Sequence, residues 1–296
     1  VNYDVSAFTV PSIDVDNIIT AEITVANLQT GGATGANVDN LNGTSNVTFG
    51  AGVTGTADVA LAAGSDSVIN AGSAAQLDVA GIEDDGASIV ATDATNTIEV
   101  EGTTATTDAV SISAAGAVAL DTNDAAGGTT DQVENLTLSG NGAAVVYTLD
   151  ATDAVETVAF SGGQNVTLAA SAASLTTETV TNTSTGVATL AVNLDNASAN
   201  LSNVATSVVV DITDTTSGGV TYTVANNANV QLSAAGVVSF DSTELTTGDE
   251  TLNLTLNIDG GGAAIGVSDF EVVNLSTVTP TTLTGDLNAE VVAGAT

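Results

Sequence analysis

The side chains of this sequence that could do chemistry are almost all carboxylates and hydroxyls. The 296 residues include 35 Asp and Glu but no Lys, Arg, His or Cys, so the formal net charge is −35. Ser/His/Asp, Cys/His and Schiff-base mechanisms therefore have no candidate residues. A carboxylate pair can hydrolyse a glycosidic bond, but acidic glycans need cationic partners, and only 3% of the residues are aromatic and could hold a neutral sugar. We therefore expect a protein that is not an enzyme, with glycan cleavage as the enzymatic alternative.

Many of the carboxylates gather in short segments that are typical of turns. Carboxylates within about three residues of each other can converge on one cation, with backbone carbonyls completing the coordination. Such all-oxygen ligands suit Ca²⁺ rather than zinc or copper. One segment, around Asp66, also matches the second half of a calcium-binding nonapeptide, although Leu61 and Ala62 replace its leading glycines. The candidate calcium ligands are Asp66, Asp84, Asp85, Asp121, Asp124, Asp150, Asp153, Asp211, Asp214, Asp249 and Glu250.

The charge balance favours bound calcium over the alternative, in which each aspartate initiates a turn and stays solvated. Two like charges at 4 Å repel by roughly 1 kcal/mol in water, and this chain has no basic side chain to offset them. Extracellular sites that bind at about 10⁻⁴ to 10⁻³ M would be filled by external calcium. We expect neither nucleic acid nor an anionic membrane as a partner, because both are bound through Lys and Arg.

The hydrophobic runs predict a soluble chain. None approaches the roughly 18 residues needed to span a membrane. The sequence begins at Val1 without the basic and apolar regions of a signal peptide. We expect a processed or excerpted chain.

Short β-strands are the elements that must position these carboxylates. The composition is 43% hydrophobic with a mean hydropathy of +0.34, which argues against disorder. Runs of Val, Ile, Leu and Thr alternate with Gly-, Asn- and Ser-rich segments, and no stretch shows a helical stripe. The phrase Val133-Glu134-Asn135-Leu136 recurs further along as Val155-Glu156-Thr157-Val158, and related phrases carry Glu178, Glu250 and Glu271.

A repeat of about 22 residues predicts an all-β fold, a parallel β-helix or β-solenoid whose coils stack about 4.8 Å apart. Tandem β-sandwich domains are the alternative, although a sandwich unit of about 100 residues is far longer than this repeat. We assign residues 1–45 to an N-terminal cap or junction segment and 46–296 to solenoid repeats, most regular over 133–275. The repeated glutamates would then stack, either bridged by a cation or splayed into solvent.

Two of these phrases, Val133-Glu134-Asn135-Leu136-Thr137-Leu138 and Phe270-Glu271-Val272-Val273-Asn274-Leu275, resemble the solenoid regions of bacterial surface-layer (S-layer) proteins of the calcium-binding, Caulobacter-like, RTX-related type. The likeness covers 133–275, and calcium-binding adhesins share the motifs. Complete glycine-rich nonapeptides are absent. The resemblance implies a lattice of calcium-bridged β-solenoids on the outer cell surface, exported by a type I system without a cleaved signal peptide.

We therefore expect a structural subunit of an extracellular, calcium-stabilised surface layer. Its partners would be copies of itself in a lattice and cell-surface polysaccharide. The absence of Lys and Arg suits permanent exposure, because trypsin-like proteases find no cleavage site. An extracellular filament or appendage subunit and a calcium-dependent adhesin are the alternatives, and they differ from a layer in the symmetry of their contacts.

Overall fold

The computed structural model describes the chain in ranges separated by short gaps, and the structural statements below concern these ranges. They are residues 2–4, 12–14, 22–25, 36–41, 43–62, 65–83, 86–103, 107–122, 133–150, 155–175, 178–193, 197–213, 219–234, 236–242, 250–258, 264–278 and 287–290. Their regular elements are β-strands and one 3-10 turn, η1 (Ala173–Leu175). No helix among them is long and apolar enough to cross a membrane.

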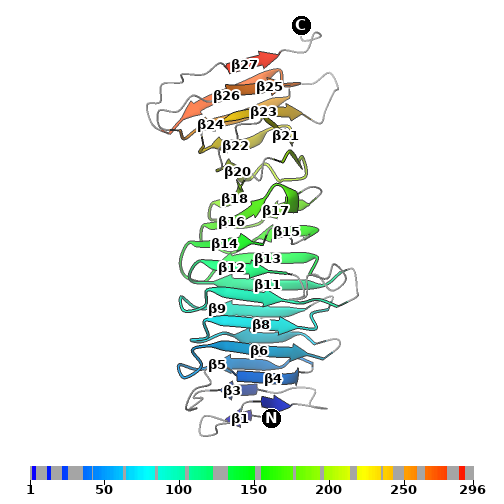
Figure 1. The fold of residues 1–296 in the computed structure, drawn as a ribbon, viewed down its shortest axis with the longest axis vertical. Coiled ribbons are helices and arrows are strands. Elements are labelled where there is room, and N and C mark those ends of the chain that lie inside the picture. Colours follow the sequence, from blue (N-terminus) through cyan, green and yellow to red (C-terminus); the bar gives the residue numbers. More distant parts are fainter. Residues whose placement is uncertain are drawn as a thin grey trace. The chain divides into compact units, whose positions relative to one another are not determined.

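The chain divides into two compact units, which are described separately. The first comprises Val1–Val166 with Thr183–Gly186, and the second comprises Thr167–Asn182 with Val187–Thr296. In both, short strands alternate with turns, and each strand pairs with a strand of the neighbouring coil (Figure 1).

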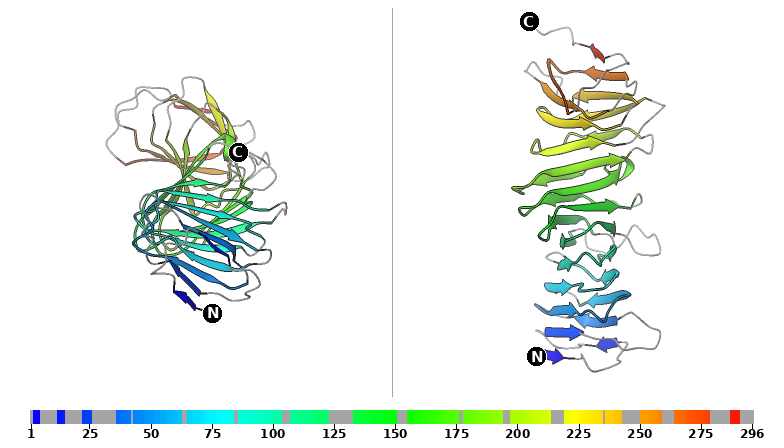
Figure 2. Two further views of the ribbon diagram at one scale, coloured as in Figure 1. Left: turned by 60° about the horizontal axis from the view of Figure 1, so that its bottom comes forward. Right: turned by 90° about the vertical axis from the view of Figure 1, so that its left-hand side faces the viewer.

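The first unit contains two parallel sheets, and successive strands of the chain alternate between them (Figure 2). The strands of sheet A are, in order, β1 (Asn2–Asp4), β3 (Glu22–Val25), β5 (Asn46–Phe49), β7 (Ser67–Asn70), β9 (Ala87–Ala91), β11 (Ala109–Ala114), β13 (Asn135–Gly140) and β15 (Thr157–Phe160). Those of sheet B are β2 (Ser12–Asp14), β4 (Ala36–Leu41), β6 (Thr56–Leu61), β8 (Gln76–Ala80), β10 (Thr97–Val100), β12 (Val118–Asp121) and β14 (Val145–Leu149).

The core of the first unit is built from side chains that repeat on successive coils. Ile69, Ile89 and Ile112 are in register on β7, β9 and β11, and all three are at most 1% exposed. Side chains alternate between buried and outward positions along these strands, as a sheet with one buried face requires. Burying one such isoleucine contributes about 1.5 to 3 kcal/mol, so each coil adds a similar increment.

The second unit repeats this parallel arrangement. Its even-numbered strands are β16 (Val166–Ser171), β18 (Ala188–Asn193), β20 (Val208–Ile212), β22 (Ala228–Leu232), β24 (Thr251–Leu256) and β26 (Val272–Thr277). A second sheet contains β19 (Ala199–Leu201), β21 (Val220–Val224), β23 (Val237–Ser242), β25 (Ala264–Ser268) and β27 (Leu287–Glu290), and β17 (Thr179–Asn182) completes the strands of this unit. Tyr222 and Phe240 are fully buried and in register, with ring centroids 6.2 Å apart.

The predicted β-solenoid is confirmed, and the sandwich alternative is not. A sandwich of the immunoglobulin type is built from antiparallel sheets, whereas the described strands pair in parallel, as in β11 with β13 and β24 with β26. The first two repeated sequence phrases, at Glu134 and Glu156, pair at equivalent positions, since Leu136 is in register with Val158. The strands within 1–45 pair in the same parallel manner, and their role as a cap or junction stays a prediction.

The length of the repeat varies in the second unit. The sequence phrases align Val208 with Val230, but the structure pairs Val210 with Val230 and Ile212 with Leu232, so this step is shorter than the phrases predict. The next step is longer, since Ala228 pairs with Leu252. Because side chains alternate with a period of two, a shift of two residues keeps the same side chains in the core. Turn length can therefore vary without disturbing the sheet.

Two glycines with positive φ provide a test of how closely the coils are stacked. A Cβ on Gly72, where φ is +57°, would lie 1.6 Å from the carbonyl oxygen of Phe49 on the neighbouring coil, whereas a Cβ on Gly142, where φ is +79°, would meet nothing within 4 Å. We expect Gly142→Ala to lower the free energy of unfolding by about 1 kcal/mol, the cost of the left-handed conformation alone. Gly72→Ala should cost more than about 2 kcal/mol, because the backbone must also move. Urea unfolding followed by circular dichroism measures both, and equal losses would contradict the close stacking at Gly72.

Candidate functional site

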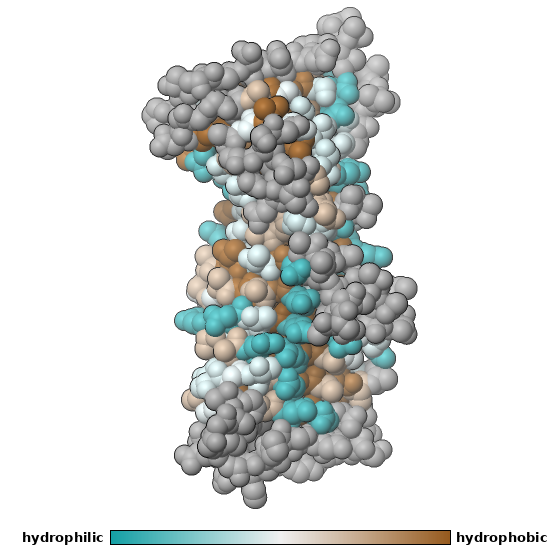
Figure 3. Space-filling view, viewed as in Figure 1, coloured by the Kyte–Doolittle hydropathy of each residue, from teal (hydrophilic) through white to brown (hydrophobic). Residues whose placement is uncertain are grey.

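A line of carboxylates runs along the outer face of sheet B in the first unit. Asp58 on β6 is in register with Asp78 on β8, Asp78 with Glu99 on β10, and Glu99 with Asp121 on β12. We call these four residues the acidic file. Neighbouring parallel strands are about 4.8 Å apart, so like charges are held at nearly the shortest spacing that the fold allows. Figure 3 shows hydrophilic residues in a line along this unit.

The carboxylates of the acidic file are positioned by the alternation of buried and outward side chains along each strand. Each carboxylate follows a buried apolar residue on its strand, and Asp58 lies between two of them, Ala57 and Val59. The flanking residues belong to the core, so the carboxylate must point outward. All four acidic residues are half-buried rather than fully exposed. The neighbouring coils therefore remove part of the water that would otherwise screen them.

Crowding within the file changes the ionisation of Asp58. Partial burial, a hydrogen bond with Asp78 and the negative charges of Asp78 and Asp39 together raise the pKa of Asp58 to about 6. Asp78 keeps a second partner, because the Gln76 side-chain amide donates to its Oδ1 at 2.8 Å. Below about pH 6, protonated Asp58 can donate a hydrogen bond to Asp78, which relieves the repulsion that no basic side chain can relieve.

The acidic file does not by itself make a metal cage. No group of three or more acidic residues within the described ranges is arranged so that it could hold a metal ion. The reason is geometric: stacked strands place carboxylates in a row, whereas a calcium cage needs six to eight oxygens that converge from several directions. The file fits loosely associated counter-ions and not a coordinated ion.

The structure brings together two predicted ligands that are distant in sequence. Leu120 is in register with Leu149, and the backbone N–H of Asp150 donates to the carbonyl of Leu120 at 3.0 Å. Asp121 and Asp150 therefore lie at equivalent positions of successive coils, so that Asp150 extends the acidic file by one exposed carboxylate.

The other predicted ligands are dispersed. Asp66 is exposed just before β7, and Asp211 and Glu250 belong to the second unit. Six of the predicted ligands lie outside the described residues, and their role in binding calcium stays a prediction: Asp84, Asp85, Asp124, Asp153, Asp214 and Asp249.

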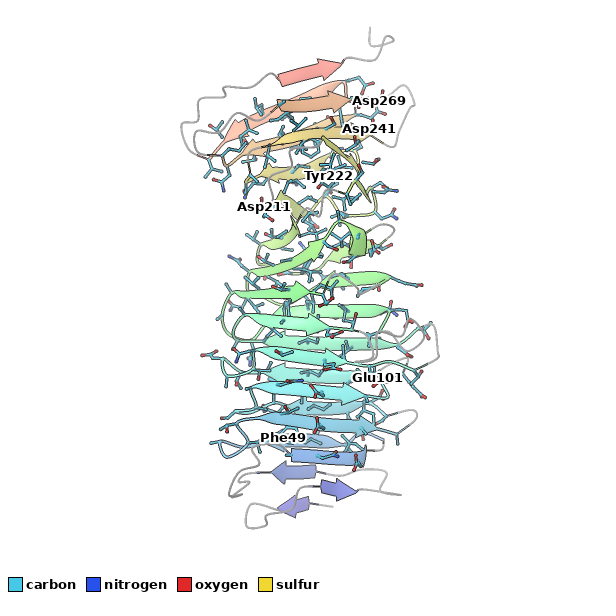
Figure 4. The ribbon with its side chains drawn as sticks, viewed as in Figure 1. Phe49, Glu101, Asp211, Tyr222, Asp241 and Asp269 are labelled. Carbon is cyan, nitrogen blue, oxygen red and sulfur yellow. The ribbon has the colours of Figure 1, made fainter. Side chains whose placement is uncertain are left out.

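Asp211 is the described residue that fits a cation ligand best. It lies on β20 and is labelled in Figure 4. The Gln231 side-chain amide donates to its Oδ2 at 3.1 Å, whereas its Oδ1 is buried and has no hydrogen-bond partner. A buried carboxylate oxygen without a donor is costly, and a cation would satisfy it. The second carboxylate of this predicted cluster, Asp214, lies outside the described residues.

Two of the repeated glutamates, Glu134 and Glu271, use a third solution besides a bridging cation or solvent. The carboxylate of Glu134 accepts the backbone N–H of Asp108 on the preceding coil at 2.9 Å, and that of Glu271 accepts the N–H of Glu250 at 2.9 Å. Partial burial nevertheless raises the pKa of Glu134, while a hydrogen bond from the Glu250 side chain lowers the pKa of Glu271. These glutamates therefore tie one coil to the next through the backbone.

The sequence analysis did not identify three members of the acidic file as site residues. They are Asp58, Asp78 and Glu99. A sequence signal did exist, because each is followed by valine and the three recur at nearly equal intervals, one coil apart. These three residues lie within strands, whereas the predicted ligands were acidic residues in segments typical of turns.

Comparison with protein-family models, with curated proteins and with solved structures finds no match to this chain.

The raised pKa of Asp58 predicts how stability depends on pH. Because its pKa of about 6 in the folded protein exceeds the ordinary 3.8, the stability that protonated Asp58 contributes is present below about pH 4 and is lost as the pH rises through 6. Asp58→Asn should therefore stabilise the protein at pH 7.5, by no more than about 1 kcal/mol because solvent screens the charges. At pH 4 it should have little effect.

Urea unfolding at the two pH values measures this difference. Asp66→Asn is the matched control, because it removes one exposed carboxylate outside the file. A loss of stability in Asp58→Asn at pH 7.5, or the same result for both variants, would contradict the crowding of the file.

The hydrogen bond between coils at Glu134 gives a second prediction. Glu134→Ala leaves the N–H of the fully buried Asp108 without this acceptor, so unfolding should become easier by about 1 to 3 kcal/mol. Glu134→Gln keeps a carbonyl acceptor and should recover most of the loss. Glu156→Ala truncates the exposed glutamate of the next phrase and should change little. Urea unfolding of the three variants measures these differences. Equal losses of unfolding free energy in Glu134→Ala and Glu156→Ala would exclude a specific hydrogen bond at Glu134.

Proposed function

We propose that this chain is a structural, self-assembling subunit of an extracellular surface layer whose negative charge is neutralised by divalent cations, with Ca²⁺ as the candidate. The observation that carries the proposal is the acidic file: in-register carboxylates on a parallel β-solenoid in a chain without one basic side chain. Charge of this kind must be neutralised from outside the protein.

The linear arrangement of the carboxylates favours a structural role over catalysis. A glycosidase needs two carboxylates that face each other across a substrate, roughly 5 to 9.5 Å apart, one acting as acid and the other as base or nucleophile. The file instead presents carboxylates side by side along one outer face of the first unit. A line of equivalent charges suits an extended contact, in which many weak interactions add up.

Calcium would act in this proposal in two ways. Loosely held ions along the acidic file would screen it, and coordinated ions would occupy turn clusters such as the one that begins at Asp211. Carboxylate oxygens that remain accessible to solvent could also share calcium with a neighbouring copy or with the hydroxyl and carboxyl groups of cell-surface polysaccharide. Both partners belong to the proposal, as does the location at the outer cell surface.

Titration of calcium into EDTA-treated protein tests the proposal. We expect calcium near 1 mM to raise the melting temperature, increase light scattering and produce sheets with two-dimensional order under the electron microscope. NaCl at matched ionic strength should screen charge but give no ordered sheets.

Three other results would each contradict the proposal in a distinct way. Filaments would favour the appendage subunit, because a single end-to-end contact produces them. A calcium-stabilised monomer would favour the adhesin. Identical behaviour with and without calcium would remove the ion from the mechanism.

A further inference from the structure

Over strands β5 to β15, the two outer faces of the first unit differ in charge, and this difference points to a contact surface. Sheet B carries the acidic file, whereas the outward positions of β5, β7, β9, β11, β13 and β15 in sheet A contain no Asp or Glu among the described residues. One in-register line along this face consists of Asn46, Val68, Ser88, Ser111, Thr137 and Ala159. We call the outer face of these six strands the neutral face.

We infer that the neutral face is where a second copy of this chain docks, sheet against sheet, and this inference rests on the proposed self-assembly. A copy of the same chain brings no cation of its own, because no side chain is basic. Contact through the sheet B faces would bury carboxylates against carboxylates, which is costly without close compensation. The neutral face allows close approach of two chains that each carry a charge of −35.

The side chains of the neutral face suit sheet-to-sheet contact. They are small, and such residues lose little rotamer entropy when they become ordered. Val68 is 42% exposed although it is apolar, and Asn46, Ser88 and Ser111 are exposed on the same face. Two sheets with short side chains can pack at about 10 Å or closer.

The size of the face predicts a weak contact. Six strands at about 4.8 Å and about five residues at 3.3 Å give roughly 480 Å² per copy, little more than half of what one partner contributes to a stable complex. An isolated dimer should therefore dissociate readily, whereas the many contacts of an array would together keep the copies associated. Because long-range repulsion opposes the contact, monovalent salt should strengthen it without calcium.

Two charge variants test the inference. Ser111→Asp places a carboxylate at the centre of the neutral face, where a two-fold contact would bring it near its own copy. Thr148→Asp adds the same charge at an exposed position of β14, on the outer face of sheet B. We expect sedimentation in 0.5 M NaCl with EDTA to show that Ser111→Asp weakens self-association at least tenfold, whereas Thr148→Asp changes it less than twofold. Thermal melts establish that both variants fold.

Cysteine crosslinking provides an independent measurement, because the chain contains no cysteine. Ser111→Cys should give a covalent dimer with a short bismaleimide in the same buffer, and Thr148→Cys should give little. Equal effects of the two Asp variants, or equal crosslinking of the two Cys variants, would overturn the assignment of the face.

The two proposals fail in distinguishable ways. If the wild-type protein stays monomeric in salt up to millimolar concentration, the neutral face is not a contact surface. Ordered sheets formed with calcium by that same protein, or by Ser111→Asp, would keep the proposed function and assign the lattice contacts to other surfaces.

Discussion

The constraint on which the structure depends is that stacking in register repeats every position about 4.8 Å away while no side chain can supply a positive charge. Apolar positions benefit from this repetition, as in the buried line of Ile69, Ile89 and Ile112. The same repetition is unfavourable for carboxylates, because it places each one beside another and the two negative charges repel. Every acidic residue on a strand must therefore find a hydrogen-bond donor, a proton, water or an external cation.

The described carboxylates show how far the protein can satisfy itself. Glu134 and Glu271 accept backbone N–H groups of the preceding coil, Asp211 accepts the Gln231 amide, and Asp58 shares a hydrogen bond with Asp78. Where the outward residue is an amide instead, stacking becomes favourable. Asn274 donates to Asn253 at 2.9 Å on the neighbouring strand, because an amide is both donor and acceptor. An ionised carboxylate only accepts, so a line of them always lacks donors.

The fold could be predicted from the sequence because its signals are local. Alternating apolar residues and Gly- or Asn-rich turns define the strands, and a recurring phrase such as the one at Glu134 and Glu156 defines the coil. The partners of the acidic residues depend on register, which the turns set. Asp121 meets Asp150 only because Val118 pairs with Tyr147, a longer step than the phrases predict. Turn lengths vary without changing the alternation, so the sequence pattern contains little information about such encounters.

The separation of charge between the acidic file and the neutral face has a consequence for assembly. If carboxylates were spread evenly, every approach of two copies would meet the same repulsion, and only cations could overcome it. In the proposed assembly, two surfaces of the first unit would respond to different conditions: contact through the neutral face would depend on ionic strength alone, and contact through the acidic file would depend on divalent ions. Contacts in two independent directions are what a layer requires and a filament does not. One repeating strand pattern can thus provide both contact surfaces. Successive strands alternate between sheet A and sheet B, so their outward side chains lie on different faces of the solenoid.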